Sequence, residues 1–172
     1  DCGSVSDYRE KKLEVNYTDN TFRNRDYFNL KYNDHKVLPP IDPWSIMSFG
    51  RWEHIYKFSN KTSSIFSNKE IRMLDFGGFN GFLPYAFSQK NNIISYVADL
   101  NPKALNMAKF LGSETINLKE NKIEEKNFDL ITIVHVLEHL DKPTEQLREL
   151  KEKLSKDGLI YAEVPNLYGF PL

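Results

Sequence analysis

The sequence has 172 residues, with 23 lysines and arginines against 24 aspartates and glutamates, and a formal net charge of −1. This length fits one domain with a sizeable core, and the balanced charge gives no general attraction to nucleic acid or to an anionic membrane. No apolar run approaches the roughly 20 residues that span a bilayer. With a single cysteine and no visible secretory leader, we expect a cytoplasmic protein.

The first 40 residues are polar and aromatic without a clean period. We therefore expect an N-terminal extension of loops and short elements over 1–40, followed by a domain over 41–172. The prolines of "LPPIDP" at 38–43 separate the two parts. The next stretch, "WSIMSFGRWEHIYKF", has apolar residues at helical spacing, which predicts one helix or two short ones broken near Gly50.

From residue 70 onward, short apolar runs alternate with helix-like stretches. The apolar runs predict strands at 71–77, 93–100, 114–118, 128–136 and 159–165. The intervening stretches predict helices at 81–89, 101–112 and 142–158. In the second helix Asn101 is the expected cap, with Pro102 at the first position. In the third, Leu147, Leu150 and Leu154 form one stripe and Gly158 is the expected stop.

This alternation predicts an α/β fold, a Rossmann-like doubly wound sheet. The sheet should be mostly parallel, with helices on both faces. Ligands of such sheets bind beyond the carboxyl ends of the strands. The residues that carry the chemistry should therefore lie in the turns that follow the strands.

The segment "LDFGGFNG" at 74–81 is a glycine-rich turn after the first predicted strand. The dinucleotide fingerprint Gly-x-Gly-x-x-Gly, started at Gly77, needs glycine at 79 and 82, and both are phenylalanine. Asp75 would also repel a pyrophosphate and favour a cationic ligand. The turn therefore disfavours a pyrophosphate.

S-adenosylmethionine fits this turn better, because it has no phosphate and carries a sulfonium and an ammonium. Asp99 lies 18 residues beyond Gly81, at the end of the second predicted strand, and its carboxylate can accept hydrogen bonds from the ribose hydroxyls. Asp75 and Asp99 could instead be turn formers. We favour ligand binding because they end consecutive strands with a glycine turn between them.

Four segments of the sequence resemble class I S-adenosylmethionine-dependent methyltransferases. They are "LDFGGFNG", "VADLNPKALNMAK", "FDLITIVHVLEHLDKP" and "LKEKLSKDGLIYAEVPN", within about 71–166. The last two are similar to the small-molecule enzymes that include ubiquinone-biosynthesis and sugar methyltransferases. The resemblance implies S-adenosyl-L-methionine as cofactor and a small-molecule methyl acceptor as partner. Nucleic acid and membrane are not expected as partners, and a homodimer is left open.

The resemblance also implies roles for individual residues. Asp99 would bind the ribose, Leu100 would lie against adenine, and Asn117 would meet the adenine amino group. His135 would face the methionine moiety or the methyl group. Apart from the resemblance, His135 or His139 is the best-placed candidate to accept a proton from the substrate. Trp44, Trp52, Tyr27 and Tyr32 could wall the acceptor site. The full cofactor site implied is Asp75, Gly77, Gly78, Gly81, Asp99, Leu100, Asn117 and His135.

Two departures from the family's pattern keep alternatives open. Phe79 replaces a frequent glycine, and the sequence ends just after the fifth predicted strand, where the family's sheet normally continues with two more strands. Either the sequence is a fragment or the natural chain is short. The alternatives are a non-catalytic S-adenosylmethionine-binding or scaffold protein of the same fold and, ranked lower, an NAD-dependent oxidoreductase.

The segment "HVLEH" at 135–139 matches the inverted zinc-peptidase motif His-x-x-Glu-His. That motif needs both histidines on one helical face, whereas His135 closes an apolar strand. We therefore expect no metal site here. For Glu138 and His139 we favour orienting the loop and packing over binding a metal ion.

Overall fold

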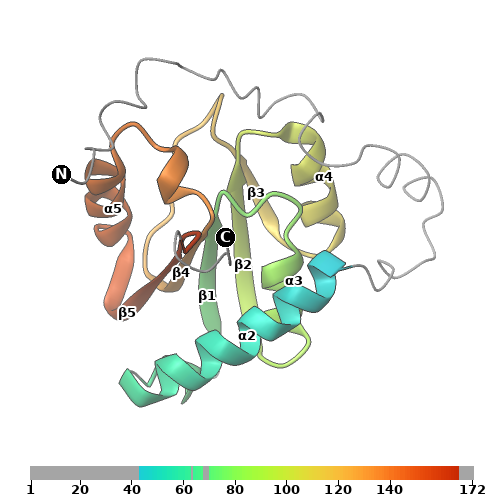
Figure 1. Ribbon diagram of the computed structural model, residues 1–172, viewed down its shortest axis with the longest axis vertical. Helices are drawn as coiled ribbons and strands as arrows, with labels where there is room; N and C mark the ends of the chain where they lie inside the picture. The colour runs from blue at the N-terminus through green and yellow to red at the C-terminus, as the bar shows by residue number, and fades with distance from the viewer. Residues whose placement is uncertain (1–42, 63, 68–69, 167–172) are drawn as a thin grey trace. The chain divides into compact units, whose positions relative to one another are not determined.

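The computed structural model describes residues 43–62, 64–67 and 70–166 (Figure 1). The extension expected over 1–40 lies outside the described residues. The described helices are α2 (Pro43–Thr62), α3 (Phe82–Ser88), α4 (Pro102–Phe110) and α5 (Pro143–Lys151), with short 3₁₀ helices η2 (Ile65–Ser67) and η3 (Leu137–His139). The described strands are β1 (Ile71–Phe76), β2 (Ile93–Asp99), β3 (Glu114–Asn117), β4 (Phe128–Val134) and β5 (Leu154–Glu163).

The five described strands form one sheet in the order β3-β2-β1-β4-β5, and every neighbouring pair is parallel. The predicted Rossmann-like doubly wound architecture is thereby confirmed. Phe76 is aligned with Ala98 on one side and with Ile133 on the other, and Val134 is aligned with Glu163. The carboxyl ends of the strands therefore lie along one edge of the sheet.

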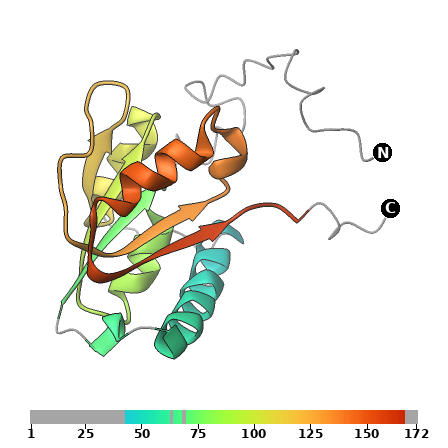
Figure 2. The same cartoon turned by 90° about the vertical axis from the view of Figure 1, so that its left-hand side faces the viewer.

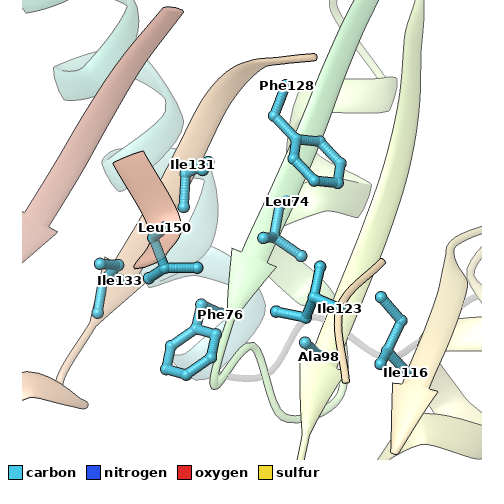
Figure 3. Close-up of a cluster of buried hydrophobic side chains, with 9 residues drawn as sticks. All are labelled: Leu74, Phe76, Ala98, Ile116, Ile123, Phe128, Ile131, Ile133 and Leu150. Carbon is cyan, nitrogen blue, oxygen red and sulfur yellow. The ribbon is translucent and has the colours of Figure 1, made fainter. Parts of the chain in front are cut away.

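One face of the sheet packs on α5 and on the loop between β3 and β4. Buried side chains that alternate along the strands, with Leu150 of α5 and Ile123 of the loop, form the cluster in Figure 3. Leu74 and Ile131 are both fully buried there. Since a parallel strand buried on both faces reads as a continuous apolar run, this packing explains the sequence "FDLITIV" of β4.

The opposite face is covered by α2, α3 and α4. Met73 and Leu130, which alternate with the residues of the first face, pack with Ile55 of α2 and Phe87 of α3. Val97 of β2 packs on α4. Figure 2 shows α5 and α2 on opposite sides of β5. Helices therefore cover both faces, as predicted.

Helix α2 runs unbroken through Gly50, which decides between the one-helix and two-helix alternatives. Its Trp52 stacks on Tyr56, and the Trp52 indole N–H donates to Asn91, in the turn that leads into β2. Trp52 thus packs among aromatic side chains that include Tyr56 and Phe87. No helix in the described ranges is long and apolar enough to cross a membrane.

The third predicted helix is shorter than expected, so this prediction was partly wrong. Helix α5 ends at Lys151, and Leu154 begins β5 instead of continuing the helical stripe. The pairing of β5 with β4 shifts register between Phe128 and Leu130, which accommodates the extra residues before Leu159. Gly158 lies inside this strand, and a Cβ there would come within 2.6 Å of the Phe128 carbonyl oxygen. Gly158 therefore permits strand contact and does not stop a helix.

Helix α4 begins and ends as its sequence predicts. The Asn101 side chain accepts hydrogen bonds from the amides of Lys103 and Ala104, and Pro102 occupies the first turn. Gly112, just past the end, has a φ of +96°. These signals are local to the chain, so the sequence is sufficient to place them.

We predict that Gly81→Ala destabilises the fold more than Gly112→Ala. Both glycines have positive φ, which costs other residues about 1–2 kcal/mol. Only Gly81 is also crowded, because a Cβ there would lie 2.9 Å from the Ala108 Cβ, whereas Gly112 faces open space. Urea unfolding should show a loss of about 2–4 kcal/mol for Gly81→Ala and about half that for Gly112→Ala. Equal losses would contradict the close approach of the loop to α4.

Candidate active site

Polar side chains follow the carboxyl ends of the strands. The expected cofactor residues are distributed over four of these ends, and Glu163 closes the fifth. Asp75 and Asp99 come from neighbouring strands. The charges of Asp99 and Arg51 both influence the pKa of the buried Asp75 carboxyl. The topology therefore brings together residues that are far apart in the sequence.

The glycine-rich loop needs its glycines for close contact. The Gly77 amide donates to the Ala98 carbonyl at 2.7 Å, which ties the loop to β2. Gly77 has a φ of +70°, and a Cβ there would lie 2.3 Å from a methyl carbon of Val136. At Gly78 a Cβ would lie 2.4 Å from Asp75 Oδ2. The loop therefore lies directly against the Asp75 carboxyl.

Asp75 is buried, with 3% of its surface exposed. The Thr132 hydroxyl donates to Asp75 Oδ1 at 2.6 Å. Burial raises the pKa of the Asp75 carboxyl to about 7, against the lowering effect of the Thr132 hydrogen bond; the Asp99 charge adds to the rise and the Arg51 charge opposes it. Near neutral pH this carboxyl is therefore poised between its acid and its anion.

Phe79 adopts the left-handed conformation that a glycine would adopt more easily, with a φ of +50°. Its amide donates to Asp99 Oδ2 at 2.9 Å, and the Asn101 amide donates to Asp99 Oδ1 at 2.8 Å. The loop thus closes with the phenylalanine present. A carboxylate has acceptor capacity for about four hydrogen bonds, so the same side chain can hold the loop and accept ribose hydroxyls.

Leu100 and Asn117 lie at neighbouring strand ends. Leu100 is 42% exposed, so its side chain is accessible for contact with a planar apolar group such as adenine. Asn117 ends β3, and its side-chain oxygen accepts the amide of Lys119 at 3.2 Å. Asn117 therefore shapes the turn after β3, and an adenine contact would have to come from the rest of its side chain.

His135 follows β4 with a φ of +55°, and its amide donates to the Glu163 carbonyl at 2.8 Å. Its Nε2 atom lies 3.2 Å from Glu163 Oε1, and its Nδ1 atom lies 3.6 Å from Glu138 Oε1. His139 lies in η3, with Nε2 3.8 Å from the same Glu138 oxygen. The structure thus brings both expected histidines to one group of carboxylates.

Arg51 and Glu163 lie beside His135, and the sequence analysis selected neither of them as a candidate for the cofactor or catalytic site. Arg51 reaches from α2 to bind both carboxylate oxygens of Glu163, with N–O distances of 2.9–3.1 Å. Burial alone would raise the pKa of the Glu163 carboxyl, but the hydrogen bonds and charge of Arg51, with smaller effects of Tyr161 and His135, hold it below its usual range. Glu163 could have been found by the rule that selected Asp75, since it ends a strand. Arg51 had no such signal.

The inverted zinc-peptidase geometry is not formed. His135 lies at the end of β4, and only the 3₁₀ helix Leu137–His139 follows it. Within the part of the chain that the structure describes, no group of three or more histidine, cysteine, aspartate or glutamate side chains is arranged to hold a metal ion.

A family model described as "Methyltransferase domain" matches residues 49–169. The chain belongs to this methyltransferase family. Its fold is that of the class I S-adenosylmethionine-dependent methyltransferases, and S-adenosylmethionine is the cofactor that goes with it. The match includes the glycine-rich loop, both strand-end aspartates, and the cluster of Arg51, His135 and Glu163.

Individual relatives cover the same region. The mitochondrial ubiquinone biosynthesis O-methyltransferase of Candida albicans is 24% identical over 90% of this chain and 50% of its own length. The plantazolicin methyltransferase BpumL, crystallised with a pentazolic desmethylPZN analogue and SAH, is 24% identical at a TM-score of 0.55 over 67% of this chain and 48% of its own. Coclaurine N-methyltransferase, bound to N-methylheliamine and SAH, is 20% identical at a TM-score of 0.52, over 64% of this chain and 35% of its own. The chain thus spans about half the length of the curated relative it matches.

The residues present fit S-adenosylmethionine. A buried acid beneath the loop, with its pKa raised to about 7, would be stabilised as an anion by a cationic ligand and destabilised by a phosphate. Asp99 lies beside the loop at the end of β2, where its carboxylate can accept hydrogen bonds from the two ribose hydroxyls. The exposed Leu100 next to it offers apolar contact.

We predict that Asp75→Asn changes how stability depends on pH. Because the folded-state pKa of Asp75 is raised to about 7 from an ordinary 3.8, the folded protein holds a proton that the unfolded chain has lost between these values. The wild type should therefore lose stability relative to Asp75→Asn as pH rises from about 4 to 7, by up to about 1.4 kcal/mol per pH unit, with no further change above.

Urea unfolding at several pH values measures this difference. Asparagine can still accept the Thr132 hydrogen bond, so the comparison isolates the charge. Thr132→Val, which removes that donor, should move the upper limit of the pH-dependent range higher. Parallel stability curves for wild type and Asp75→Asn would show that Asp75 is not the buried acid that the packing indicates.

Proposed function

We propose that this chain binds S-adenosylmethionine and transfers its methyl group to a small-molecule acceptor. The observation that carries the proposal is the hydrogen bond from the Phe79 amide to Asp99, because it joins the glycine-rich loop to the strand-end carboxylate of β2. This bond keeps the Asp99 carboxylate, which would accept hydrogen bonds from the ribose hydroxyls, beside a loop that lacks the glycine pattern of a pyrophosphate site. The arrangement suits an adenosyl ligand with a charged amino-acid part.

The chain's own residues would divide the work of binding. Asp99 would accept the ribose hydroxyls, Leu100 would contact the adenine, and Gly77, Gly78 and Asp75 would line the methionine side. When bound, S-adenosylmethionine supplies an activated methyl group together with its leaving group. The protein then needs mainly to align the acceptor, at about 3 Å from the reacting carbon, and to exclude water.

A small-molecule acceptor is supported by the relatives' substrates and by the charge of the chain. Those relatives act, by their names, in ubiquinone biosynthesis or on plantazolicin and coclaurine. The formal net charge of −1 gives no general attraction to nucleic acid. His135 and His139, on the β4 side of the cofactor edge, are the candidates to accept a proton from the acceptor.

Two alternatives are less well supported. Membership of the methyltransferase family decides against the NAD-dependent oxidoreductase. The scaffold alternative rested partly on Phe79 as an obstruction, but Phe79 takes the positive φ of a glycine and its amide bonds to Asp99. We therefore favour the enzyme.

We predict that Asp99→Ala weakens binding of S-adenosylmethionine and S-adenosylhomocysteine by about 10–100-fold, because hydrogen bonds to a charged group are worth about 1.5–3 kcal/mol. Isothermal titration calorimetry with both ligands measures this loss. The matched control is Asp129→Ala. The Asp129 carboxylate also accepts a backbone amide, from Arg72 at 2.9 Å, but it lies near the start of β4, at the opposite end of the sheet.

Asp129→Ala should lose stability yet keep the wild-type affinity for both ligands. If a folded wild-type sample binds neither ligand, the proposal fails. If Asp99→Ala binds as tightly as Asp129→Ala, the ribose site lies elsewhere.

A further inference from the structure

A cluster of charged residues lies on the β4–β5 side of the cofactor edge and is formed by Arg51, His135, Glu138 and Glu163. We call it the His135 cluster. It joins helix α2, the turn after β4 and the end of β5. Arg51 is 15% exposed and Glu163 27% exposed, so the contacts between them are partly shielded from water.

The backbone places the His135 ring next to the glycine-rich loop. His135 has a φ of +55°, which is uncommon for a residue other than glycine, and its amide donates to the Glu163 carbonyl at 2.8 Å. The next residue, Val136, packs on the loop, since a Cβ at Gly77 would lie 2.3 Å from one of its methyl carbons. The turn that carries the ring therefore also contacts the loop expected to hold the cofactor.

Arg51 determines the role of one ring nitrogen of His135. Its Nη2 atom lies 3.2 Å from His135 Nε2 and makes a hydrogen bond with it. A guanidinium has donors and no acceptor, so Nε2 is the acceptor in this bond. Nη2 carries two N–H groups, and it also donates to Glu163 Oε1 at 2.9 Å. One nitrogen of Arg51 therefore serves both the ring and the carboxylate.

Glu163 holds Arg51 in this position and does not itself bond the ring. Its carboxylate accepts from Arg51 Nε and Nη2 at 2.9–3.1 Å. His135 Nε2 lies 3.2 Å from Glu163 Oε1, which is an ion-pair distance, but no hydrogen bond joins the two side chains among the described residues. A proton on Nε2 would meet the N–H of Arg51 and break its bond. The neutral ring therefore keeps its proton on Nδ1.

The surroundings of Nδ1 favour the same tautomer. Nδ1 lies 3.6 Å from Glu138 Oε1, and the negative charge of that carboxylate attracts a proton on the nearby nitrogen. The distance is too long for a direct hydrogen bond, so the N–H can donate to another acceptor. The His135 side chain is 37% exposed, which allows a ligand to reach it.

Neither charge state of the ring leaves a lone pair to accept a proton. In the neutral ring the Nε2 lone pair is used by Arg51, and in a charged ring both nitrogens carry protons. The other titratable neighbours are His139, with Nε2 3.8 Å from Glu138 Oε1, and Tyr161, whose hydroxyl donates to Glu163 Oε2 at 3.1 Å. Of the two histidines expected to accept a proton, His139 therefore remains.

We propose that Arg51, anchored by Glu163, is a positioning residue that keeps the neutral His135 ring protonated on Nδ1, so that His135 acts on the methyl acceptor as a hydrogen-bond donor and not as its base. This inference rests on the proposed function and narrows it. The Nδ1–H group suits an acceptor molecule with an oxygen that can receive this bond. His135 takes up no proton during methyl transfer.

The test reads the tautomer directly, by long-range ¹H–¹⁵N NMR of the histidine rings at a pH where they are neutral. His135→Asn assigns the signal among the four histidines. We expect the wild-type ring to carry its proton on Nδ1, in about tenfold or greater excess over the Nε2–H form, because that form loses the bond from a charged donor. A histidine in water favours the Nε2–H form, so the expected result reports the contact with Arg51.

Arg51→Met removes the donor and should invert the tautomer. With Arg51 absent, the Glu163 carboxylate at 3.2 Å would attract a proton to Nε2, so the Nε2–H form should become the major one. Glu163→Gln is the matched control, because a carboxamide oxygen can still accept from Arg51 and the ring should stay protonated on Nδ1. Tyr161→Phe removes another partner of Glu163 and should also leave the ring unchanged.

Three outcomes would overturn the inference. The first is a wild-type ring protonated on Nε2, which decides the matter even if Arg51→Met fails to fold. The second is an unchanged Nδ1–H form in folded Arg51→Met. The third is a proton that moves in Glu163→Gln but not in Arg51→Met, because the carboxylate and not the guanidinium would then set the tautomer.

The proposed function fails separately from this inference. Calorimetry with S-adenosylhomocysteine on the same wild-type sample tests the cofactor site, and absence of binding would refute the proposed function while the tautomer result stands as a property of the cluster. Where the ligand binds, the Nδ1–H form should persist in the complex. A switch to the Nε2–H form on binding would leave the proposed function intact and refute the donor role of His135.

Discussion

The glycine-rich loop lies against two carboxylates, and the rest of the candidate site depends on this arrangement. Asp75 lies beneath Gly78, so close that a Cβ at Gly78 would meet its oxygen at 2.4 Å, and Asp99 accepts the amide of Phe79. The two acids stand on adjacent strands, with Asp75 aligned with Val97 and Asp99 two residues further on. The loop's shape is therefore inherited from the parallel register of β1 and β2.

The surroundings of His135 depend on a contact across most of the described chain. Arg51 and Glu163 are 112 residues apart in sequence, and their ion pair links α2 to the end of β5. Removing one partner of a shielded pair leaves the other charge without compensation, which costs more than the pair itself contributes. The pair thus links the position of helix α2 to the surroundings of His135.

The sequence was sufficient where the determining signal is local. Apolar runs marked the strands, and Asn101 and Pro102 marked the start of α4. The sequence was insufficient where the pairing of one strand with another decides the structure. Leu154 fits a helical stripe, and only its alignment with Phe128 of β4 makes it the start of a strand.

Phe79 shows a second limit of the same kind. A phenylalanine is unfavourable in a tight turn because of its side chain. Phe79 nevertheless adopts a positive φ, and its amide donates a hydrogen bond to Asp99. Likewise, nothing near Arg51 in the sequence indicates that it faces Glu163. A residue whose role comes from a distant partner cannot be recognised from its neighbours in sequence.

A crystal structure of the chain with S-adenosylhomocysteine tests the central claim most directly. We expect both ribose hydroxyls to donate to the Asp99 carboxylate at about 2.7–3.0 Å, with the Phe79 amide still bonded to it and the loop unchanged. A ligand that binds without contacting Asp99, or a loop that must open and turn Phe79 out of its left-handed conformation to admit it, would contradict the account.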